Sequence, residues 1–409
     1  MIFTRAKGAL VWDSTGKEYI DCTSQAWSNN IGATDDRILA AAWSQMQNLT
    51  HLRSNYDSVP LLLLSKELAQ SAPGKLKRVG YCLHGSMAVE MAVKIAVKNR
   101  PNSGPLITLY DGYHGRSLAT MGWSWPHINN DFNSLFPPVV RIPHPYHYRY
   151  ALPGEKPVQM ARRCANILRD TIHYAVNGKP AAFLMEPVQG NGTQLDFPPE
   201  YYHYVREICT EENVLLIWDE IQTGMGRCGT MWAAEYYGVE PDIIIFGKGV
   251  GGGFPLAGII AREDLIGFEP GDDALTFGQF PVSLAAGLAA LRVLKEDKLL
   301  DNCKKMGAYA TKLLHEFEKR HPLIGNVRGP GLNIGIELVR DRNTKEPAAH
   351  EALQVYSRGL DQGVIFGTTR YGGIGNVVKI KPPLCINQEQ MDHVLEVFDQ
   401  ILTEIEEKR

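Results

Sequence analysis

The feature that most constrains the fold of this chain is a set of short, uninterrupted apolar runs that alternate with stretches of helical period. A strand buried on both faces is apolar throughout, whereas a half-exposed strand alternates apolar and polar residues. Runs of this kind indicate a mostly parallel sheet covered by helices, which is an α/β architecture. We predict five such strands, at Val79–Leu83, Leu106–Tyr110, Ala181–Met185, Val214–Trp218 and Asp242–Phe246.

Apolar residues at helical spacing fill the intervals between these strands. They predict helices at Ser86–Lys98, Pro157–Val176, Glu200–Glu212 and Val282–Glu296. With 409 residues the chain is long enough for a large domain and a smaller partner, and the pattern changes after residue 296. We therefore expect a large domain over residues 45–295 and a small α+β domain formed by residues 1–44 and 296–409.

Charge and cysteine content narrow the class of protein. The net charge is −3, which leaves no dominant basic surface for nucleic acid. The seven cysteines are scattered and form no CxxC pair, so we expect reduced thiols in a cytoplasmic protein, without a disulfide framework or a metal site. The first residues lack a signal-peptide core, and the stretch 274–291 is interrupted by polar residues and a proline. We expect neither export nor a membrane span.

The strand at 242–246 runs directly into Gly247-Lys248-Gly249. Glycines on both sides leave room for another molecule to approach the amine closely. A lysine removed from water has a lowered pKa and becomes a nucleophile that forms Schiff bases with carbonyl compounds. Taken alone, the motif also fits a surface lysine whose stem lies along apolar residues. Gly247, Gly249 and Gly252 also match the spacing of a dinucleotide-binding motif, which requires a helix directly after the glycines. The Gly-Gly-Gly-Phe-Pro segment here is a poor helix start, which argues against nucleotide binding.

An acidic pair, Asp219-Glu220, follows the apolar strand at 214–218. Burying a carboxylate costs several kcal/mol unless it meets a cation or a donor, so Asp219 needs a partner. A protonated pyridine nitrogen would serve as that partner. The alternative is a carboxylate that caps the loop after it.

Two further strand ends carry groups suited to an anion and to an aromatic ring. Gly85, Ser86 and Met87 open a helix directly after a strand, where backbone N–H groups attract an anion. A plain N-cap at Ser86 is compatible with that role. Tyr113 and Arg116 follow the strand at 106–110 and offer an aromatic plate beside a carboxylate-binding cation. Taken alone, they would also fit a loop packed by its tyrosine.

A reactive lysine, a buried carboxylate, an anion cradle and an aromatic plate are the parts needed to hold pyridoxal 5′-phosphate (PLP). The chain resembles the class III aminotransferases, the ornithine- and 4-aminobutyrate-like family, along essentially its whole length. The resemblance rests on motifs in a fixed order: Glu186-Pro187-Val188-Gln189-Gly190, Asp219-Glu220-Ile221-Gln222-Thr223-Gly224, Gly247-Lys248-Gly249, Thr276-Phe277-Gly278, Arg328-Gly329-Pro330-Gly331-Leu332 and Lys381-Pro382-Pro383-Leu384.

The resemblance implies the PLP-dependent fold type I and a homodimer with shared active sites. It implies that Lys248 holds PLP as a Schiff base and transfers protons, and that Asp219 pairs with the pyridinium nitrogen. It further implies these cofactor contacts: Gly85, Ser86 and Met87 at the phosphate, Tyr113 stacked on the ring, Ile221 on the other face, Gln222 at the phenolic oxygen, Glu186 beside the cofactor, and Thr276 at the phosphate of the neighbouring subunit.

Several positions depart from the family pattern. Glutamate-using members carry a second glutamate after the Glu-Pro motif and an arginine before Pro-Pro-Leu, whereas this chain has Asn191 and Lys379. A lysine lacks the planar fork of arginine, so glutamate is a poorer fit as amino donor, while the retained Arg116 still favours an acidic substrate. Met87 replaces a glutamate, but backbone N–H groups still hold a phosphate. Trp27 matches an aromatic residue of the substrate pocket, or is a packed core tryptophan.

We therefore expect a PLP-dependent aminotransferase that acts on an amino acid or an ω-amino compound and on a keto acid. A PLP-dependent racemase, epimerase or lyase begins from the same link between substrate and cofactor, and remains the alternative among enzymes. A cofactor-binding regulator would be expected to lack Lys248 or to carry a DNA-binding segment, and neither is seen in the sequence.

Overall fold

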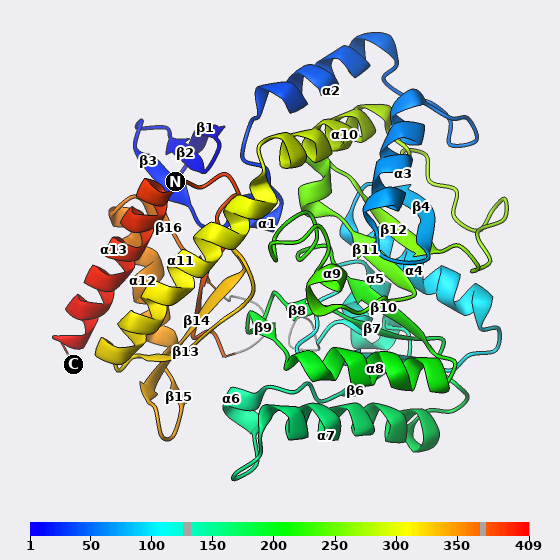
Figure 1. Ribbon diagram of the computed structural model, residues 1–409. Helices are drawn as coiled ribbons and strands as arrows, with labels where there is room; N and C mark the ends of the chain where they lie inside the picture. Colours follow the sequence, from blue (N-terminus) through cyan, green and yellow to red (C-terminus); the bar gives the residue numbers. More distant parts are fainter. Residues whose placement is uncertain (126–131, 369–373, 409) are drawn as a thin grey trace.

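A seven-stranded sheet forms the centre of the protein in the computed structural model, which describes residues 1–125, 132–368 and 374–408 (Figure 1). The strand order is β4 (Leu76–Cys82), β12 (Ala257–Arg262), β11 (Ile243–Phe246), β10 (Leu215–Asp219), β7 (Ala182–Met185), β5 (Leu106–Leu109) and β6 (Val139–Ile142). β12 is antiparallel to both of its neighbours, and the other strand pairs are parallel. The five predicted strands are present as β4, β5, β7, β10 and β11, so the expected α/β fold with a mostly parallel sheet is confirmed.

Burial on both faces of this sheet explains the continuous apolar runs. Along β10, Leu216 and Trp218 enter one hydrophobic core, while Leu215 and Ile217 enter a second core on the opposite face. The helix α4 (Gly85–Asn99) packs into the second core. The first core is closed by α3 (Val59–Ser71), α7 (Pro157–Asp170), α8 (Pro199–Glu211) and α10 (Pro281–Glu296).

The predicted helix at 157–176 is shorter than expected. α7 ends at Asp170 and the chain continues as one π-helical turn, η3 (Thr171–Ala175). The Thr171 hydroxyl donates to the carbonyl of Ile167 at 2.7 Å, a side-chain bond that competes with the regular helical ladder. The strands β6 and β12 were not among the predicted strands.

The N-terminal segment lies with the C-terminal part of the chain, on the left of Figure 1. One sheet has the order β1 (Phe3–Lys7), β2 (Leu10–Asp13), β3 (Glu18–Asp21) and β16 (Val364–Ile365), and a second has β13 (Ile324–Arg328), β14 (Ile334–Asp341), β18 (Val377–Ile380) and β17 (Gly367–Thr368), with β15 (Glu346–Pro347) beside β14. Three long helices accompany them: α11 (Leu299–Arg320), α12 (Ala349–Asp361) and α13 (Gln388–Glu406).

The predicted boundary after residue 44 falls inside α2 (Asp36–Asn48), which packs on α10. The division into residues 45–295 and residues 1–44 with 296–409 stays a prediction. The remaining elements are short: α1 (Ser24–Trp27), α5 (Leu118–Trp123), η2 (Asn133–Leu135), α6 (His147–Tyr150), β8 (Val188–Gln189), β9 (Leu195–Asp196), α9 (Ala233–Tyr237) and η4 (Lys248–Gly251). Within the described ranges, no helix has both the length and the apolar character needed to cross a bilayer.

Candidate active site

Polar side chains gather at one edge of the central sheet, where parallel strands end. β10 and β11 lie side by side with Asp219 opposite Ile245, so the residues that follow both strands emerge at the same edge. Lys248 follows β11 after a single glycine, and α4 begins shortly after β4. The carboxyl ends of parallel strands are where α/β proteins bind ligands. The fold thus brings three of the sequence motifs into one region.

Lys248 begins the turn η4 with a φ of 47°, in the left-handed region that residues other than glycine rarely adopt. Such a conformation costs about 1–2 kcal/mol and persists only where the surrounding structure imposes it. Desolvation lowers the pKa of the Lys248 amine, while the negative charges of Asp219 and Glu186 partly oppose this. More of the amine is therefore uncharged, which is the form that attacks a carbonyl carbon.

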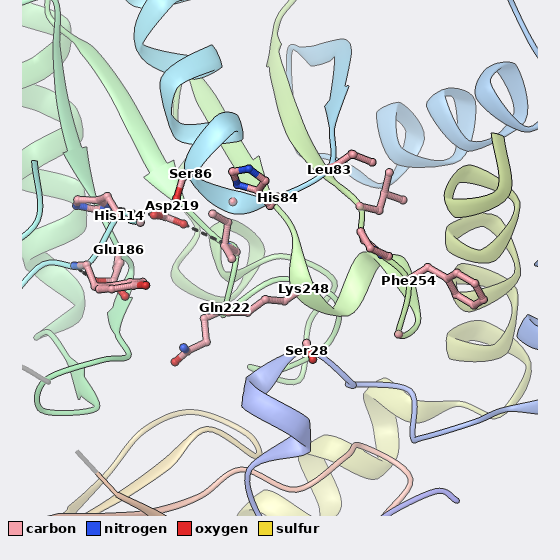
Figure 2. Close-up of a pocket in the computed structure, with 17 residues that line it drawn as sticks. Ser28, Leu83, His84, Ser86, His114, Glu186, Asp219, Gln222, Lys248 and Phe254 are labelled. Carbon is pink, nitrogen blue, oxygen red and sulfur yellow. Dashed lines mark hydrogen bonds and ion pairs between the residues drawn. The ribbon is translucent and has the colours of Figure 1, made fainter. Parts of the chain in front are cut away.

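Asp219 is paired with a histidine. It is 4% exposed, and its Oδ2 lies 2.9 Å from Nδ1 of His114, while the backbone N–H of Ile221 donates to its Oδ1 at 3.2 Å (Figure 2). Because a carboxylate only accepts hydrogen bonds, Nδ1 of His114 carries the proton in this pair. The pair holds the carboxylate in one orientation toward the cavity. His114 lies between Tyr113 and Arg116 in the sequence and was not among the predicted site residues.

Glu186 ties two loops of the site together. Its Oε1 accepts from the backbone N–H of Tyr113 at 2.8 Å, and its Oε2 accepts from the backbone N–H of Gly190 at 3.0 Å. Burial raises the pKa of the Glu186 carboxyl, and these two N–H groups partly oppose the rise. The contacts fix the backbone that carries the Tyr113 ring at the cavity wall.

The first turn of α4 lies at the cavity. Within the described residues, its N-cap makes no side-chain cap bond, so backbone N–H groups of Gly85, Ser86 and Met87 remain for a bound anion. The Met87 side chain packs against the second core, which leaves only its backbone for that role. A Cβ on Gly115, where φ is 132°, would lie 2.3 Å from Oγ of Ser86. Only glycine therefore lets this loop approach Ser86 so closely.

These groups surround a cavity of about 470 Å³. Figure 2 shows His84 and Ser86 along one side, the Asp219–His114 pair beside them, and Gln222 and Lys248 below. Ile221 also lines the cavity, and a Cβ on Gly85 would lie 2.8 Å from its Cδ1, so the two close the wall together.

The described residues fit PLP. The volume lies in the usual range for small-molecule sites, about 300–1,000 Å³. The helix N-terminus suits the phosphate, Asp219 suits the ring nitrogen, and Lys248 suits the aldehyde carbon. Tyr113 and Ile221 supply walls for the faces of the ring.

Asn191 and Lys379, two of the positions that depart from the family pattern, lie together. Nζ of Lys379 donates to the carbonyl oxygens of Gly190 and Asn191, at 2.7 and 3.0 Å. Burial lowers the pKa of Lys379 to about 7. Trp27 ends the turn α1, whose four residues all have positive φ, and its ring centroid lies 5.7 Å from Nζ of Lys379. Gly190 donates its backbone N–H to Glu186, which lines the cavity, but Trp27, Asn191 and Lys379 are not among the lining residues. Their contacts with substrate stay a prediction.

Arg116 and Thr276 are exposed. The Arg116 guanidinium lies 5.5 Å from the centroid of the Tyr113 ring, and its backbone N–H donates to Oγ of Ser86 at 2.9 Å. Thr276 lies in the loop before α10 and is not among the residues that line the cavity of its own subunit. The substrate role of Arg116 and the phosphate role of Thr276 stay predictions.

Lys381 is a buried residue that the sequence reasoning quoted only as part of a motif. Its Nζ donates to Oε1 of Gln222 and, at 3.1 Å, to Oε1 of Gln194. Its side chain is fully buried, and this burial lowers its pKa well below the usual range. The clue in the sequence was a second lysine two positions after Lys379, directly past the end of β18.

The fold and this site define a PLP-dependent enzyme of fold type I. The model of the class III aminotransferase family matches residues 1–402. An isoleucine 2-epimerase from Lentilactobacillus buchneri is 34% identical over 415 residues, covering 99% of this chain and 90% of that protein. An acetylornithine aminotransferase from Methanosarcina acetivorans is 34% identical over 401 residues, covering 98% of this chain and 91% of that protein.

Solved structures agree. The omega transaminase from Pseudomonas jessenii, in complex with PMP, superposes with a TM-score of 0.92 at 28% identity, covering 99% of this chain and 92% of that one. The chain belongs to the class III aminotransferase family. The expectation of a class III, PLP-dependent aminotransferase is thereby confirmed.

Proposed function

We propose that the protein transfers amino groups between an amino acid or ω-amino compound and a keto acid, with Lys248 as the covalent attachment point of PLP. One observation carries the proposal. The Lys248 amine, with its lowered pKa, opens into the same cavity as Asp219, Tyr113 and the N-terminus of α4. No separate role in the fold requires this combination at one strand edge.

Bound PLP supplies an aldehyde that captures amines and a protonated ring that takes up the electron pair of a broken Cα–H bond. Asp219 keeps the ring nitrogen protonated, and His114 holds Asp219 in place. The amine of Lys248 takes the proton from Cα and returns it, because its lowered pKa leaves more of it uncharged and able to accept a proton. Glu186 accepts a hydrogen bond from the backbone N–H of Tyr113 and so holds the Tyr113 loop beside the cavity.

We propose a homodimer whose subunits share their active sites. Trp43, Val59 and Leu62 are 61%, 70% and 58% exposed on α2 and α3, and Phe277, next to Thr276, is 48% exposed. Several large exposed apolar side chains are typical of a surface that a second subunit covers. The Thr276 loop would then be free to reach the phosphate site of the partner subunit.

The cytoplasm is the proposed location. All seven cysteines lie in the described part of the chain, and each is a free thiol. Free thiols are typical of a reducing compartment.

Racemisation of an α-amino acid is the second candidate. The observation that favours it is the isoleucine 2-epimerase among the similar proteins, at 34% identity over nearly the whole chain. Both reactions need a base that removes the Cα proton, and they differ in where the next proton is delivered.

The attachment site is tested by borohydride reduction of the PLP-loaded protein, followed by mass spectrometry of its peptides. Wild type should carry the reduced adduct on Lys248, and Lys248→Ala should carry none. Lys298→Ala is the matched control, because Lys298 is exposed and has a similar φ of 51°. An adduct on another lysine of the wild type would overturn the assignment.

The reaction is tested with single enantiomers of amino acids, incubated with and without a keto acid and analysed by chiral chromatography. An aminotransferase consumes the amino acid only in step with the keto acid. Interconversion of enantiomers without any keto acid would support the racemase instead.

A further inference from the structure

Lys381 follows β18 and is completely buried, yet its partners are neutral oxygens. Nζ donates to the side-chain oxygens of Gln222 and Gln194, and lies 4.6 Å from the centroid of the Trp27 ring. A buried lysine is costly unless its N–H groups are satisfied. Lys381 is therefore energetically costly to bury, and its N–H groups donate to two side-chain amides.

The contacts of Gln194 determine which way its amide points. Its Nε2 donates to the backbone oxygen of Asn333 at 3.0 Å and to Oδ1 of Asn333 at 2.7 Å. Because both of these partners are acceptors, the nitrogen of Gln194 must face Asn333. Its oxygen therefore faces Lys381, and the lysine is held from that side.

Gln222 is oriented by the same reasoning. Nζ of Lys381 donates to Oε1 of Gln222, so the oxygen of this amide faces the lysine. The amide sits in a narrow slot, since a Cβ on Gly190 would lie 1.9 Å from that oxygen. Nε2 of Gln222 then presents its N–H groups away from Lys381, and Gln222 lines the cavity that contains Lys248.

We propose that Lys381 is a positioning residue, which fixes the amide of Gln222 so that its N–H groups, and not its oxygen, face the phenolic oxygen of PLP. The inference rests on the proposed function, in which PLP occupies this cavity. A donor at that oxygen stabilises its anionic form. The link between PLP and Lys248 then loses its proton at a lower pH than it would beside an acceptor.

The test is a spectroscopic pH titration of the PLP-loaded protein, without substrate. The visible absorption of bound PLP reports the protonation of its link to Lys248. We expect Lys381→Met, which keeps the volume and removes the donor, to raise the midpoint by about one pH unit, the size of one hydrogen bond to a charged oxygen. Replacing a buried ionisable side chain by an apolar one of similar volume is usually tolerated, and Lys381→Leu is the second variant should Lys381→Met not fold.

The decisive comparison repeats the substitution in Gln222→Ala protein. A positioning residue acts only through the group it orients, so Lys381→Met should cause no further shift in that background. Lys379→Met is the matched control, because Lys379 is also buried, lies two positions away and bonds to main-chain carbonyls instead of Gln222. Its effect should be the same with and without Gln222.

Two results would overturn the inference: an unchanged midpoint in folded Lys381→Met or Lys381→Leu protein, or an equal shift in both backgrounds. The second result would mean that Lys381 acts independently of Gln222. Failure of the proposed function looks different. If the proposed function is wrong, the wild type shows no visible PLP band, or the band persists in Lys248→Ala protein.

Discussion

Asp219→Asn tests whether the buried carboxylate keeps the cofactor ring protonated. The structure determines how the new amide would lie. The backbone N–H of Ile221 donates to Oδ1, so the amide oxygen must occupy that place and the amide nitrogen must face His114. His114 Nδ1 would then have to accept, which moves its proton to Nε2, a buried atom without a partner among the described residues. The variant thus loses the negative charge and also disturbs the histidine.

The magnitude follows from what is lost. The neutral amide removes one charge-assisted hydrogen bond to the ring nitrogen, in a site where Asp219 is 4% exposed and water screens little. Removing one preorganised electrostatic contact of this kind costs about 3–4 kcal/mol, or about 10²–10³-fold in kcat. Affinity for PLP should fall less, because the helix N-terminus and Lys248 remain.

The assay is a single-turnover reaction of PLP-loaded enzyme with an amine, followed by stopped-flow absorption. Glu220→Gln is the matched control. Glu220 is the next residue and is equally buried, but its carboxylate accepts from the backbone N–H groups of Ala233 and Ala234, at 2.6 and 2.9 Å, and does not line the cavity. We expect it to lower the unfolding free energy and leave the single-turnover rate near that of wild type.

A wild-type rate in Asp219→Asn protein would refute the reasoning, because the ring nitrogen would then not need the carboxylate. Equal rate losses in both variants would also refute it. That outcome would assign the effect to the loss of any buried carboxylate at the end of β10.

Three further predictions concern the subunit interface, the substrate and the pH dependence. Mixing inactive Lys248→Ala and Thr276→Ala subunits should restore activity in the heterodimers, because one of their two sites then contains both Lys248 and Thr276. If well-mixed dimers recover no activity, the active sites are not shared. Arg116→Ala should raise the KM for an acidic substrate by about two- to fivefold in steady-state kinetics, a small effect because Arg116 is exposed; an unchanged KM would remove it from the substrate site. Burial lowers the pKa of Lys379 to about 7, so between about pH 7 and its usual value of 10.5 the lysine is neutral in the folded protein and charged in the unfolded chain. The free energy of unfolding therefore increases as the pH rises through that window. Urea unfolding should show Lys379→Met more stable than wild type at pH 6, with the difference shrinking toward pH 10.

Much of the fold could be predicted from the sequence because burial leaves a local signature. Strands buried on both faces are apolar along their length: β11 is apolar at every position, and β10 is apolar up to Asp219, which ends it at the cavity. The glycines around Lys248 and the serine at the start of α4 are also local signals, since turns and helix ends need particular residues. The strand β12 was missed, although its burial resembles that of its neighbours. Its antiparallel place between β11 and β4 depends on the path of the chain and not on its own pattern.

The amino-acid sequence by itself thus determined five strands of the central sheet, the helices between them and the family, together with the residues expected at the cofactor. Only the tertiary structure decided the partners of those residues. His114 and Asp219 are 105 positions apart, and Gln222 and Lys381 are 159 positions apart. Their contacts depend on the order of strands in the sheet and on the placing of the C-terminal strand beside the cavity. Local periodicity records which side of an element is buried, but it carries no information about which distant side chain will meet it there.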